Sequence, residues 1–383
     1  MKHIIIKSDQ IKGEIMKKRS LLLAVMMLSI FVLTACGGAS NDKAANDNKA
    51  ANNAAADAGD KKDGEKLKVG FVTDEGGIND QSFNQGVWEG LQKAQKELGI
   101  KAEYIESKDT KDYTPNLETF ADQEKNIIVG AGYKMGDNVA EAAGMYPEIN
   151  YAIVDVDVTA GPDGKIEAPK NLLGIMFRAQ EPSFLVGYIA GMTTETNKVG
   201  FVGGQESNII WGFEYGYKAG VDYAAKERGT EIEVLSQYVG NFSDAQKGKS
   251  ITATMYQNGA DVVFHAAGGA GEGVIEAAKE AGKWAIGVDR DQSDRAPENV
   301  LTSAMKNADV AVYQVVKDMQ EGKFEGGRTI EFGLSDDGAV GIAPTSDKNV
   351  KPEVLKSVEE ISKKIVSGEI KVPYNEETYN EYK

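Results

Sequence analysis

The sequence predicts an α/β fold in which two doubly wound parallel sheets form two lobes. From Leu67 onward, short β-rich runs alternate with amphipathic helical patterns. Continuous apolar strands separated by helices indicate parallel sheets that are covered on both faces. The phrase KVGFV also occurs twice, at 68–72 and 198–202, and each copy is followed by a loop and a helical pattern. The chain therefore starts the same structural unit twice.

The two copies match beyond the repeated phrase when they are aligned at an offset of 130 residues. The matched pairs are Lys68 with Lys198, Phe83 with Phe213, Gly86 with Gly216, and Gly90 with Gly220. Small residues four positions apart on a helix permit close approach to a sheet. We interpret the copies as the first βα units of two similar lobes.

The first 35 residues have the pattern of a secretory signal peptide. A basic stretch, MKKRS (16–20), precedes an apolar run of 15 residues at 21–35. A helix that spans a membrane needs about 20 apolar residues. We expect a signal peptide over 1–35, with an uncleaved membrane anchor as the alternative. Met16 is a second candidate for the start, besides Met1.

Cys36 is the only cysteine and so has no intramolecular disulfide partner. The stretch LTACGG (33–38) resembles the bacterial lipobox, in which the cysteine is lipidated and becomes the mature N-terminus. Two or more acyl chains would anchor the chain stably to a membrane. Residues 37–66 contain no aromatic and no large aliphatic side chain, so we expect 36–66 to be a lipidated cysteine and a disordered tether.

The folded part is predicted element by element from the same alternation. The predicted strands are 67–73, 102–106, 126–130, 150–155, 172–177, 198–203, 231–238, 260–264, 283–288 and 299–303. The predicted helices are 82–98, 136–146, 181–195, 211–227, 243–257, 270–282, 307–321 and 352–367.

The charge of the chain limits its partners. The formal net charge is −16, and because residues 1–35 hold six Lys/Arg and two Asp/Glu, the chain from Cys36 onward carries −20. Such an acidic surface argues against a nucleic acid or an anionic lipid surface as partner.

The predicted site lies in the cleft between the two lobes, because open α/β sheets bind ligands beyond the carboxyl ends of their strands. The loop after each KVGFV copy opens into this cleft, so Phe83 and Phe213 occupy equivalent places on the two lobes. Two facing rings would clamp a flat ligand. The alternative is that both are core residues at the start of a helix.

Polar candidates follow the predicted strands. Asp74, Asp155 and Asp289 each close a strand and could accept hydrogen bonds from a ligand. Their alternative role is that of a helix cap or turn residue. Lys306 could donate into the same cleft or be a solvated lysine at a helix start. The Gly-rich turn HAAGGAGEG (265–273) lets backbone N–H groups approach a ligand.

The sequence contains no convincing motif for a nucleotide-triphosphate site, a metal site or a catalytic site. The stretch SDAQKGKS (243–250) lacks the first glycine of a phosphate-binding loop, and DRDQSD (289–294) lacks the glycine of a calcium loop. Only His265 remains in the mature chain to serve a Cys/His metal site or a catalytic triad, and no GxSxG motif accompanies it. His265 is expected to pack or bond locally. We expect no cofactor, no metal and no enzyme activity.

Five stretches carry a resemblance to a known family. They are GFVTDEGGINDQSFNQGVWEGL, FRAQEPSFLVGYIAG, NFSDAQKGK, VVFHAAGGAGEGV and IGVDRDQ. Together with the lipobox they resemble the basic membrane protein family of bacterial lipoproteins, over about 68–373. Within that family the chain is most similar to the purine nucleoside receptors of ABC importers.

The resemblance implies a type I periplasmic-binding-protein fold with three hinge crossings. We expect 67–178 with 306–332 to form lobe 1 and 179–305 with 333–383 to form lobe 2. The implied ligand is guanosine, inosine or adenosine, which the lobes capture by closing and deliver to an ABC permease. The protein is expected to be a monomer, anchored by lipid on the extracytoplasmic side of the cell membrane.

The resemblance also implies roles for individual residues. Phe83 and Phe213 would sandwich the base, with Trp211 as the alternative ring if the loop register shifts. The acids and the lysine of the family correspond to Asp74 and Asp155 near the base, Asp289 near the ribose hydroxyls, and Lys306. Asn84 and Gly269 are further ligand-binding candidates.

Two other functions stay open at this point. A sugar or autoinducer receptor has the same fold, and an aromatic pair can also stack on a sugar. A surface adhesin or an extracellular enzyme that acts on nucleosides belongs to a different class.

Overall fold

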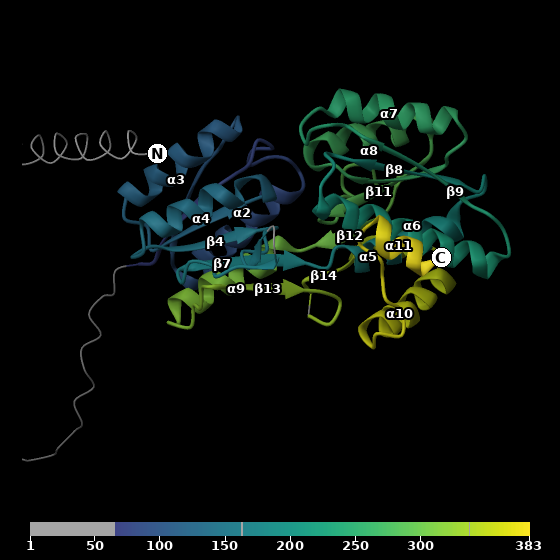
Figure 1. Ribbon diagram of the computed structural model, residues 1–383. Coiled ribbons are helices and arrows are strands. Elements are labelled where there is room, and N and C mark those ends of the chain that lie inside the picture. Colours follow the sequence, from purple (N-terminus) through teal and green to yellow (C-terminus); the bar gives the residue numbers. More distant parts are fainter. Residues whose placement is uncertain (1–65, 162–163, 337) are drawn as a thin grey trace, which may run out of the picture. The chain divides into compact units, whose positions relative to one another are not determined.

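The computed structural model describes residues 66–161, 164–336 and 338–383 (Figure 1). The predicted signal peptide, Cys36 and the predicted tether up to residue 65 lie outside the described residues. The described part contains two six-stranded sheets and a small hairpin, β5 (Ala160–Gly161) with β6 (Gly164–Lys165). We call the part around the first sheet lobe 1 and the part around the second sheet lobe 2.

The sheet of lobe 1 is parallel and has the order β13-β7-β4-β3-β1-β2. Its strands are β1 (Lys68–Val72), β2 (Lys101–Ile105), β3 (Ile127–Ala131), β4 (Asn150–Val154), β7 (Leu172–Phe177) and β13 (Arg328–Phe332). The helices α2 (Phe83–Leu98) and α9 (Ala308–Gln320) pack on one face of this sheet, and α3 (Tyr113–Asp122) and α4 (Gly136–Met145) pack on the other.

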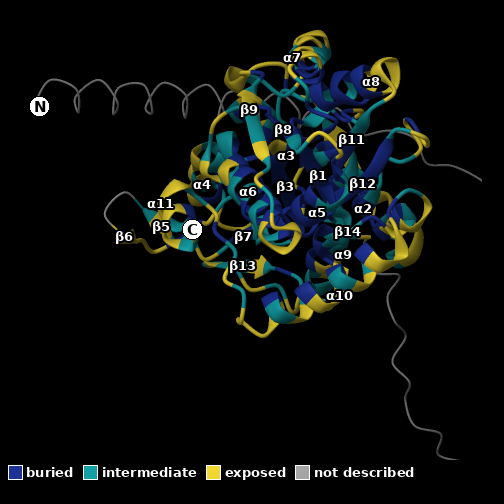
Figure 2. Cartoon of the chain, turned by 90° about the vertical axis from the view of Figure 1, so that its right-hand side faces the viewer, coloured by how far each residue is buried: buried dark blue, intermediate teal, exposed yellow. Residues whose placement is uncertain are grey.

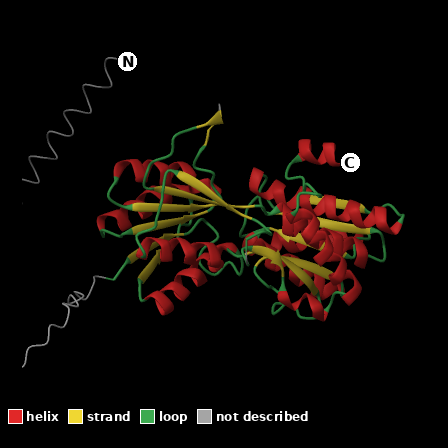
Figure 3. Cartoon of the chain, turned by 90° about the horizontal axis from the view of Figure 1, so that it is seen from below, coloured by secondary structure: helices red, strands yellow, loops and turns green. Residues whose placement is uncertain are grey.

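The sheet of lobe 2 has the order β14-β12-β11-β10-β8-β9 and is parallel except for β14. Its strands are β8 (Lys198–Gly203), β9 (Glu233–Tyr238), β10 (Val262–Ala266), β11 (Trp284–Asp289), β12 (Val300–Lys306) and β14 (Val340–Ile342). One face carries α5 (Gln180–Thr193), α6 (Asn208–Arg228), α10 (Pro352–Val366) and α11 (Glu376–Tyr382), and the other carries α7 (Ala245–Gln257) and α8 (Gly271–Ala281). Figure 3 shows helices on both sides of the strands in each lobe.

Burial explains why the strand sequences are continuously apolar. Helices cover both faces of each sheet, so nearly every strand residue of β3 and β10 is buried. In Figure 2 the strands are mostly dark blue and the exposed residues gather on the outer helices and loops. The predicted class of two doubly wound, mostly parallel sheets is confirmed.

The helix boundaries follow local capping chemistry. Helix α6 begins at Asn208, because the Ser207 side chain accepts a hydrogen bond from the backbone N–H of Ile210. It ends at Arg228, because Gly229 follows with a positive φ of 65°. The sequence prediction started this helix at 211 and so placed the boundary three residues late.

The chain passes between the two sheets after β7, after β12 and after β13, within the ranges that the structure describes. Strand β12 belongs to the sheet of lobe 2, whereas the next helix, α9, packs against α2 of lobe 1. The segments α3, β13, β14, α11 and the β5–β6 hairpin were not predicted from the sequence. None of the helices in the described residues has the length and hydropathy needed to cross a membrane.

Candidate functional site

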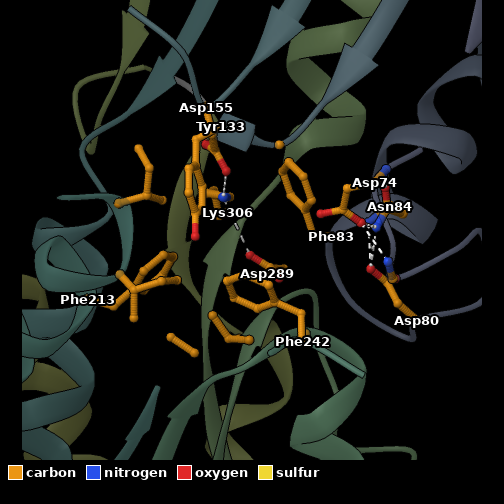
Figure 4. Close-up of a pocket in the computed structure, with 17 residues that line it drawn as sticks. Asp74, Asp80, Phe83, Asn84, Tyr133, Asp155, Phe213, Phe242, Asp289 and Lys306 are labelled. Atoms are coloured by element: carbon orange, nitrogen blue, oxygen red, sulfur yellow. Dashed lines mark hydrogen bonds and ion pairs between the residues drawn. The ribbon is translucent and has the colours of Figure 1, made fainter. Parts of the chain in front are cut away.

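A pocket lies between the two lobes, at the carboxyl ends of strands from both sheets (Figure 4). It encloses about 520 Å³ of space between the atoms, part of which is open to solvent. The lining residues are Asp74, Gly76, Asp80, Phe83, Asn84, Gly132, Tyr133, Asp155, Ile209, Ile210, Phe213, Phe242, Ala266, Gly268, Val288, Asp289 and Lys306. This position is that of ligand sites in proteins with open parallel sheets.

On the side of lobe 1, the pocket is bordered by two carboxylates, Asp74 and Asp80, which the amide of Asn84 bridges. The Nδ2 group of Asn84 donates to Asp74 Oδ1 at 2.7 Å and to Asp80 Oδ2 at 3.0 Å. Asp80 also accepts the backbone N–H groups of Ser82, Asn84 and Gln85, which close the first turn of α2. Asp74 is thereby held at the end of β1 with its second oxygen free to face the pocket.

A buried lysine joins the two lobes at the base of the pocket. Lys306 Nζ, at the end of β12, lies 2.7 Å from Asp155 Oδ2 of lobe 1 and 3.9 Å from Asp289 Oδ1 of lobe 2. Asp155 directly follows β4 and Asp289 is the last residue of β11. Both aspartates have a positive φ, 67° for Asp155 and 64° for Asp289. The two lobes thus present equivalent strand-end carboxylates to a single ammonium group.

Four aromatic rings border the same space. Phe83 lies at the start of α2, with the Nζ of Lys306 4.4 Å from its ring centroid. Phe242, in the loop between β9 and α7, is half-buried and meets Tyr133 of lobe 1 edge-on, with ring centroids 6.5 Å apart. Phe213 reaches the pocket but is almost fully buried, and its ring packs against the core residue Phe264 at 6.4 Å.

The enclosure changes the acidity of the polar groups. Burial raises the pKa of both Asp74 and Asp289 to about 6. Burial by itself would lower the pKa of Lys306, but the Asp155 and Asp289 carboxylates outweigh it and raise that pKa. Lys306 therefore stays charged, whereas Asp74 and Asp289 titrate close to neutral pH.

The structure brings seven of the eight predicted ligand-binding residues to this pocket. These are Asp74, Phe83, Asn84, Asp155, Phe213, Asp289 and Lys306. Gly269 is the exception, because its neighbour Gly268, at a φ of +54°, is the glycine that borders the pocket. Trp211, the alternative ring, is 39% exposed and does not line the pocket.

Sequence reasoning missed Asp80, Tyr133 and Phe242, which also line the pocket. Asp80 and Phe242 lie in loops, and Tyr133 begins a 3-10 helix (Tyr133–Met135) just after β3, so hydrophobic periodicity carries no signal at these positions. The NFSD stretch that contains Phe242 follows a predicted strand, so its position beyond a strand end was the available clue.

His265 packs locally, as the sequence analysis expected. It is fully buried at the end of β10, and its Nε2 lies 3.0 Å from Gln292 Oε1. Burial lowers the pKa of His265 to about 4, so the ring is neutral at physiological pH. Within the described residues no group of three or more His, Cys, Asp or Glu side chains is arranged to hold a metal ion.

Comparisons with known proteins agree with this geometry. The sequence profile of the family Bmp, described as "ABC transporter substrate-binding protein PnrA-like", matches residues 67–376. A CD4+ T-cell-stimulating antigen from Listeria innocua is 42% identical over 381 residues, which cover 94% of this chain and 99% of the antigen. A Lactococcus lactis protein named ABC transporter nucleoside-binding protein BmpA is 38% identical, with 80% of this chain and 89% of the relative covered.

A solved structure shows the same architecture. An ABC transporter solute-binding protein from Aeropyrum pernix K1 superposes with a TM-score of 0.74 at 29% sequence identity, covering 82% of this chain and 96% of that one. The two lobes described above therefore form a type I periplasmic-binding-protein fold.

Proposed function

Because this chain belongs to the family of PnrA-like ABC transporter substrate-binding proteins, we propose that it captures a purine nucleoside in the pocket between its lobes. The resemblance to basic membrane proteins is confirmed by the family match, and that family consists of substrate-binding proteins of transporters rather than enzymes. The nucleoside, the lipid anchor and the residue roles are the proposed parts.

The observation that carries the proposal is the combination of aromatic rings and carboxylates in one interlobe pocket. A purine base has two flat apolar faces, which suit aromatic rings, and a polar edge, which suits hydrogen-bonding groups. Its ribose carries hydroxyl donors that a carboxylate accepts. The name of the Lactococcus lactis relative, a nucleoside-binding protein, supports the same ligand class.

We assign the faces of the base to Phe83 from lobe 1 and to Phe242 and Phe213 from lobe 2. Phe242 is the better candidate for stacking because its ring is half-buried, whereas Phe213 is 2% exposed and packs against the core residue Phe264. Phe213 would form the floor beside them. The sequence analysis expected Phe213 itself to be the stacking ring, and the experiment below separates the two.

The polar groups divide between the base and the sugar in this proposal. Asp74 and Asn84 would bind the edge of the base, since they share one hydrogen-bonded network on the same wall. Asp289 would accept from ribose hydroxyls. Asp155 and Lys306 would link the ligand site to both lobes through their ion pair.

The mechanism follows from the two-lobed architecture. We propose that residues 67–178 with 307–332 and residues 179–306 with 333–383 move as two bodies about the crossings, with Lys306 at the end of β12 in lobe 2. A ligand that touches both lobes favours the closed arrangement by its additional affinity for that state. The closed monomer would then dock on an ABC permease, which accepts the nucleoside at the membrane.

Calorimetry on variants tests the assignment of the rings. Phe83→Ala and Phe242→Ala should each weaken guanosine binding by about 1–3 kcal/mol, the value of one aromatic–base stack. Phe213→Leu, which preserves the core, should have a smaller effect. Trp211→Ala is the matched control, because this exposed ring lies outside the pocket. Unchanged affinity in both alanine variants of the pocket would refute the stacking model.

Ligand competition tests the nucleoside class. Inosine, guanosine and adenosine should compete with one another, whereas free ribose should not. Asp289→Ala should reduce affinity for guanosine more than for guanine, because only the nucleoside carries ribose hydroxyls. Displacement by ribose alone would instead favour a sugar receptor.

The anchor is tested on Cys36. Metabolic labelling with radioactive palmitate should mark the wild-type chain, and Cys36→Ser should remove the label and release the protein from the membrane fraction. A cell fraction in which the serine variant remains membrane-bound would contradict anchoring through this cysteine.

A further inference from the structure

Gln292 is buried next to the pocket without lining it, and its side chain reaches the opposite lobe. Its Oε1 accepts a hydrogen bond from the backbone N–H of Val288 at 2.9 Å. Its Nε2 donates to the backbone carbonyl of Gln81 in lobe 1 at 3.0 Å. Because the N–H of Val288 can only donate, Oε1 has to face it and the amide NH₂ has to face Gln81.

His265 fixes the same orientation. Its Nε2 lies 3.0 Å from Gln292 Oε1, which is an acceptor, so Nε2 carries the proton. The imidazole is fully buried and its Nδ1 has no hydrogen-bond partner among the described residues. Within lobe 2 the amide of Gln292 is therefore held in place before any contact with lobe 1 is made.

The partner segment in lobe 1 is equally well defined. Gln81 has a φ of +56°, a left-handed conformation that a residue other than glycine rarely adopts without support from its surroundings. Ser82, which follows it, is fully buried, and its hydroxyl donates to Asp289 Oδ2 of lobe 2. Its own backbone N–H donates to Asp80 Oδ1, which ties the segment to the start of α2.

We propose that Gln81 and Ser82 of lobe 1 and Asp289 and Gln292 of lobe 2 form an interlobe latch that prolongs closure around the ligand. Both of its hydrogen bonds join different lobes, so they exist only while the lobes are together. Gln292 is a positioning residue here, since it does not line the pocket. The inference rests on the proposed function, in which the lobes open and close around a nucleoside.

The latch also orients a ligand-facing carboxylate. The Ser82 hydroxyl donates to Oδ2 of Asp289, a residue that lines the pocket, while Oδ1 of Asp289 lies 3.9 Å from Lys306 Nζ. Closing the latch therefore sets the direction of the oxygen that we assign to the ribose. Loss of the latch should shorten the lifetime of the complex more than it slows its formation.

Two single substitutions remove one interlobe bond each. Gln292→Glu keeps the acceptor for Val288 and His265 but removes the NH₂ donor to Gln81. Ser82→Ala removes the hydroxyl donor to Asp289. The matched control is Gln320→Glu, because the Gln320 amide donates to the Leu98 carbonyl at 2.9 Å within lobe 1. Thermal unfolding is measured first, to establish that all three variants are folded.

Stopped-flow tryptophan fluorescence measures guanosine release from the full chain. The dissociation rate should rise about 5- to 30-fold in Gln292→Glu and in Ser82→Ala, the range expected for one lost buried hydrogen bond. The association rate should change less than 2-fold, as is usual for variants of one interface. The control should match the wild type. Unchanged dissociation in both latch variants would overturn the inference.

A second measurement tests the latch whatever the ligand is. Spin labels are attached to cysteines introduced at exposed Lys96 of lobe 1 and exposed Lys279 of lobe 2, in a Cys36→Ser background. Gln292→Glu should shift the distance distribution toward longer separations, and an unshifted distribution would reject the latch. If wild-type protein fails to bind guanosine, the proposed function is wrong, while this distance measurement still decides on the latch.

Discussion

Substituting Gly90 with alanine should separate two helices that pack unusually closely in lobe 1. Gly90 lies in the middle of α2, where this helix crosses the first turn of α9. A Cβ atom added at Gly90 would lie 2.5 Å from the backbone oxygen of Asp309 and 2.7 Å from its Cα. Both obstacles are backbone atoms, so no side chain can rotate away to make room.

The expected cost follows from those distances. Carbon atoms in contact prefer a separation of about 3.5–4.0 Å, so α9 has to move by roughly 1 Å. Overpacking a well-filled core costs about 1–3 kcal/mol, and replacing a helical glycine with alanine returns up to about 1 kcal/mol. Gly90→Ala should therefore lower the free energy of unfolding by about 1–2 kcal/mol.

The control is one turn away on the same helix. A Cβ atom at Gly86 would meet nothing within 4 Å, so Gly86→Ala gains helix propensity without overlap. It should raise the free energy of unfolding by about 0.5–1 kcal/mol. Urea titration followed by circular dichroism measures both variants. Equal stability changes of the same sign at Gly86 and Gly90 would refute the close-crossing argument.

Three further predictions concern the charged groups. Burial raises the pKa values of Asp74 and Asp289 to about 6, so guanosine affinity should fall as the pH drops below 6 and these carboxylates become protonated. Calorimetry between pH 5 and 8 measures this change. A constant affinity over that range would contradict the role of the two side chains as carboxylate acceptors. Burial lowers the pKa of His265 to about 4, below its value of about 6.5 in the unfolded chain. Between these two pH values only the unfolded chain binds the proton, so the free energy of unfolding should fall as the pH drops from 6.5 to 4. In urea titrations, His265→Asn should remove about 3 kcal/mol of this pH dependence. Lys306→Met should lower the free energy of unfolding by about 3–5 kcal/mol, because it leaves buried carboxylates without a counter-ion. The control Lys323→Met, at an exposed ion pair, should lower it by less than about 1 kcal/mol. Similar melting temperatures for the two variants would argue against a structural role of the Lys306 ion pair.

Much of the fold could be predicted because its signals are local. The strands β1 and β8 carry the repeated KVGFV phrase, and each lies second from one end of its sheet. The short strands β13 and β14 escaped prediction because they are edge strands of modest burial. Their pairing partners lie in distant parts of the sequence, which no local pattern records.

The repeat also led to an equivalence that the helices do not keep. Phe83 is the first residue of α2, whereas Phe213 lies five residues after the start of α6 at Asn208. Five residues turn a helix by about 500°, so the two rings leave their helices at different heights and in different directions. Phe213 lines the pocket and also packs against the core residue Phe264, while the loop residue Phe242 borders the pocket from the same lobe.

The order of strands in lobe 1 has a consequence for synthesis on the ribosome. Strand β13 pairs with β7, although about 150 residues separate them along the chain, and α9 covers α2 from the same late segment. At 5–20 residues per second, lobe 1 waits roughly eight to thirty seconds for the pieces that complete it. Its apolar surface around Val87 and Leu91 stays uncovered during that interval, so a truncated chain that stops before residue 308 is expected to aggregate although it contains one whole copy of the repeated unit.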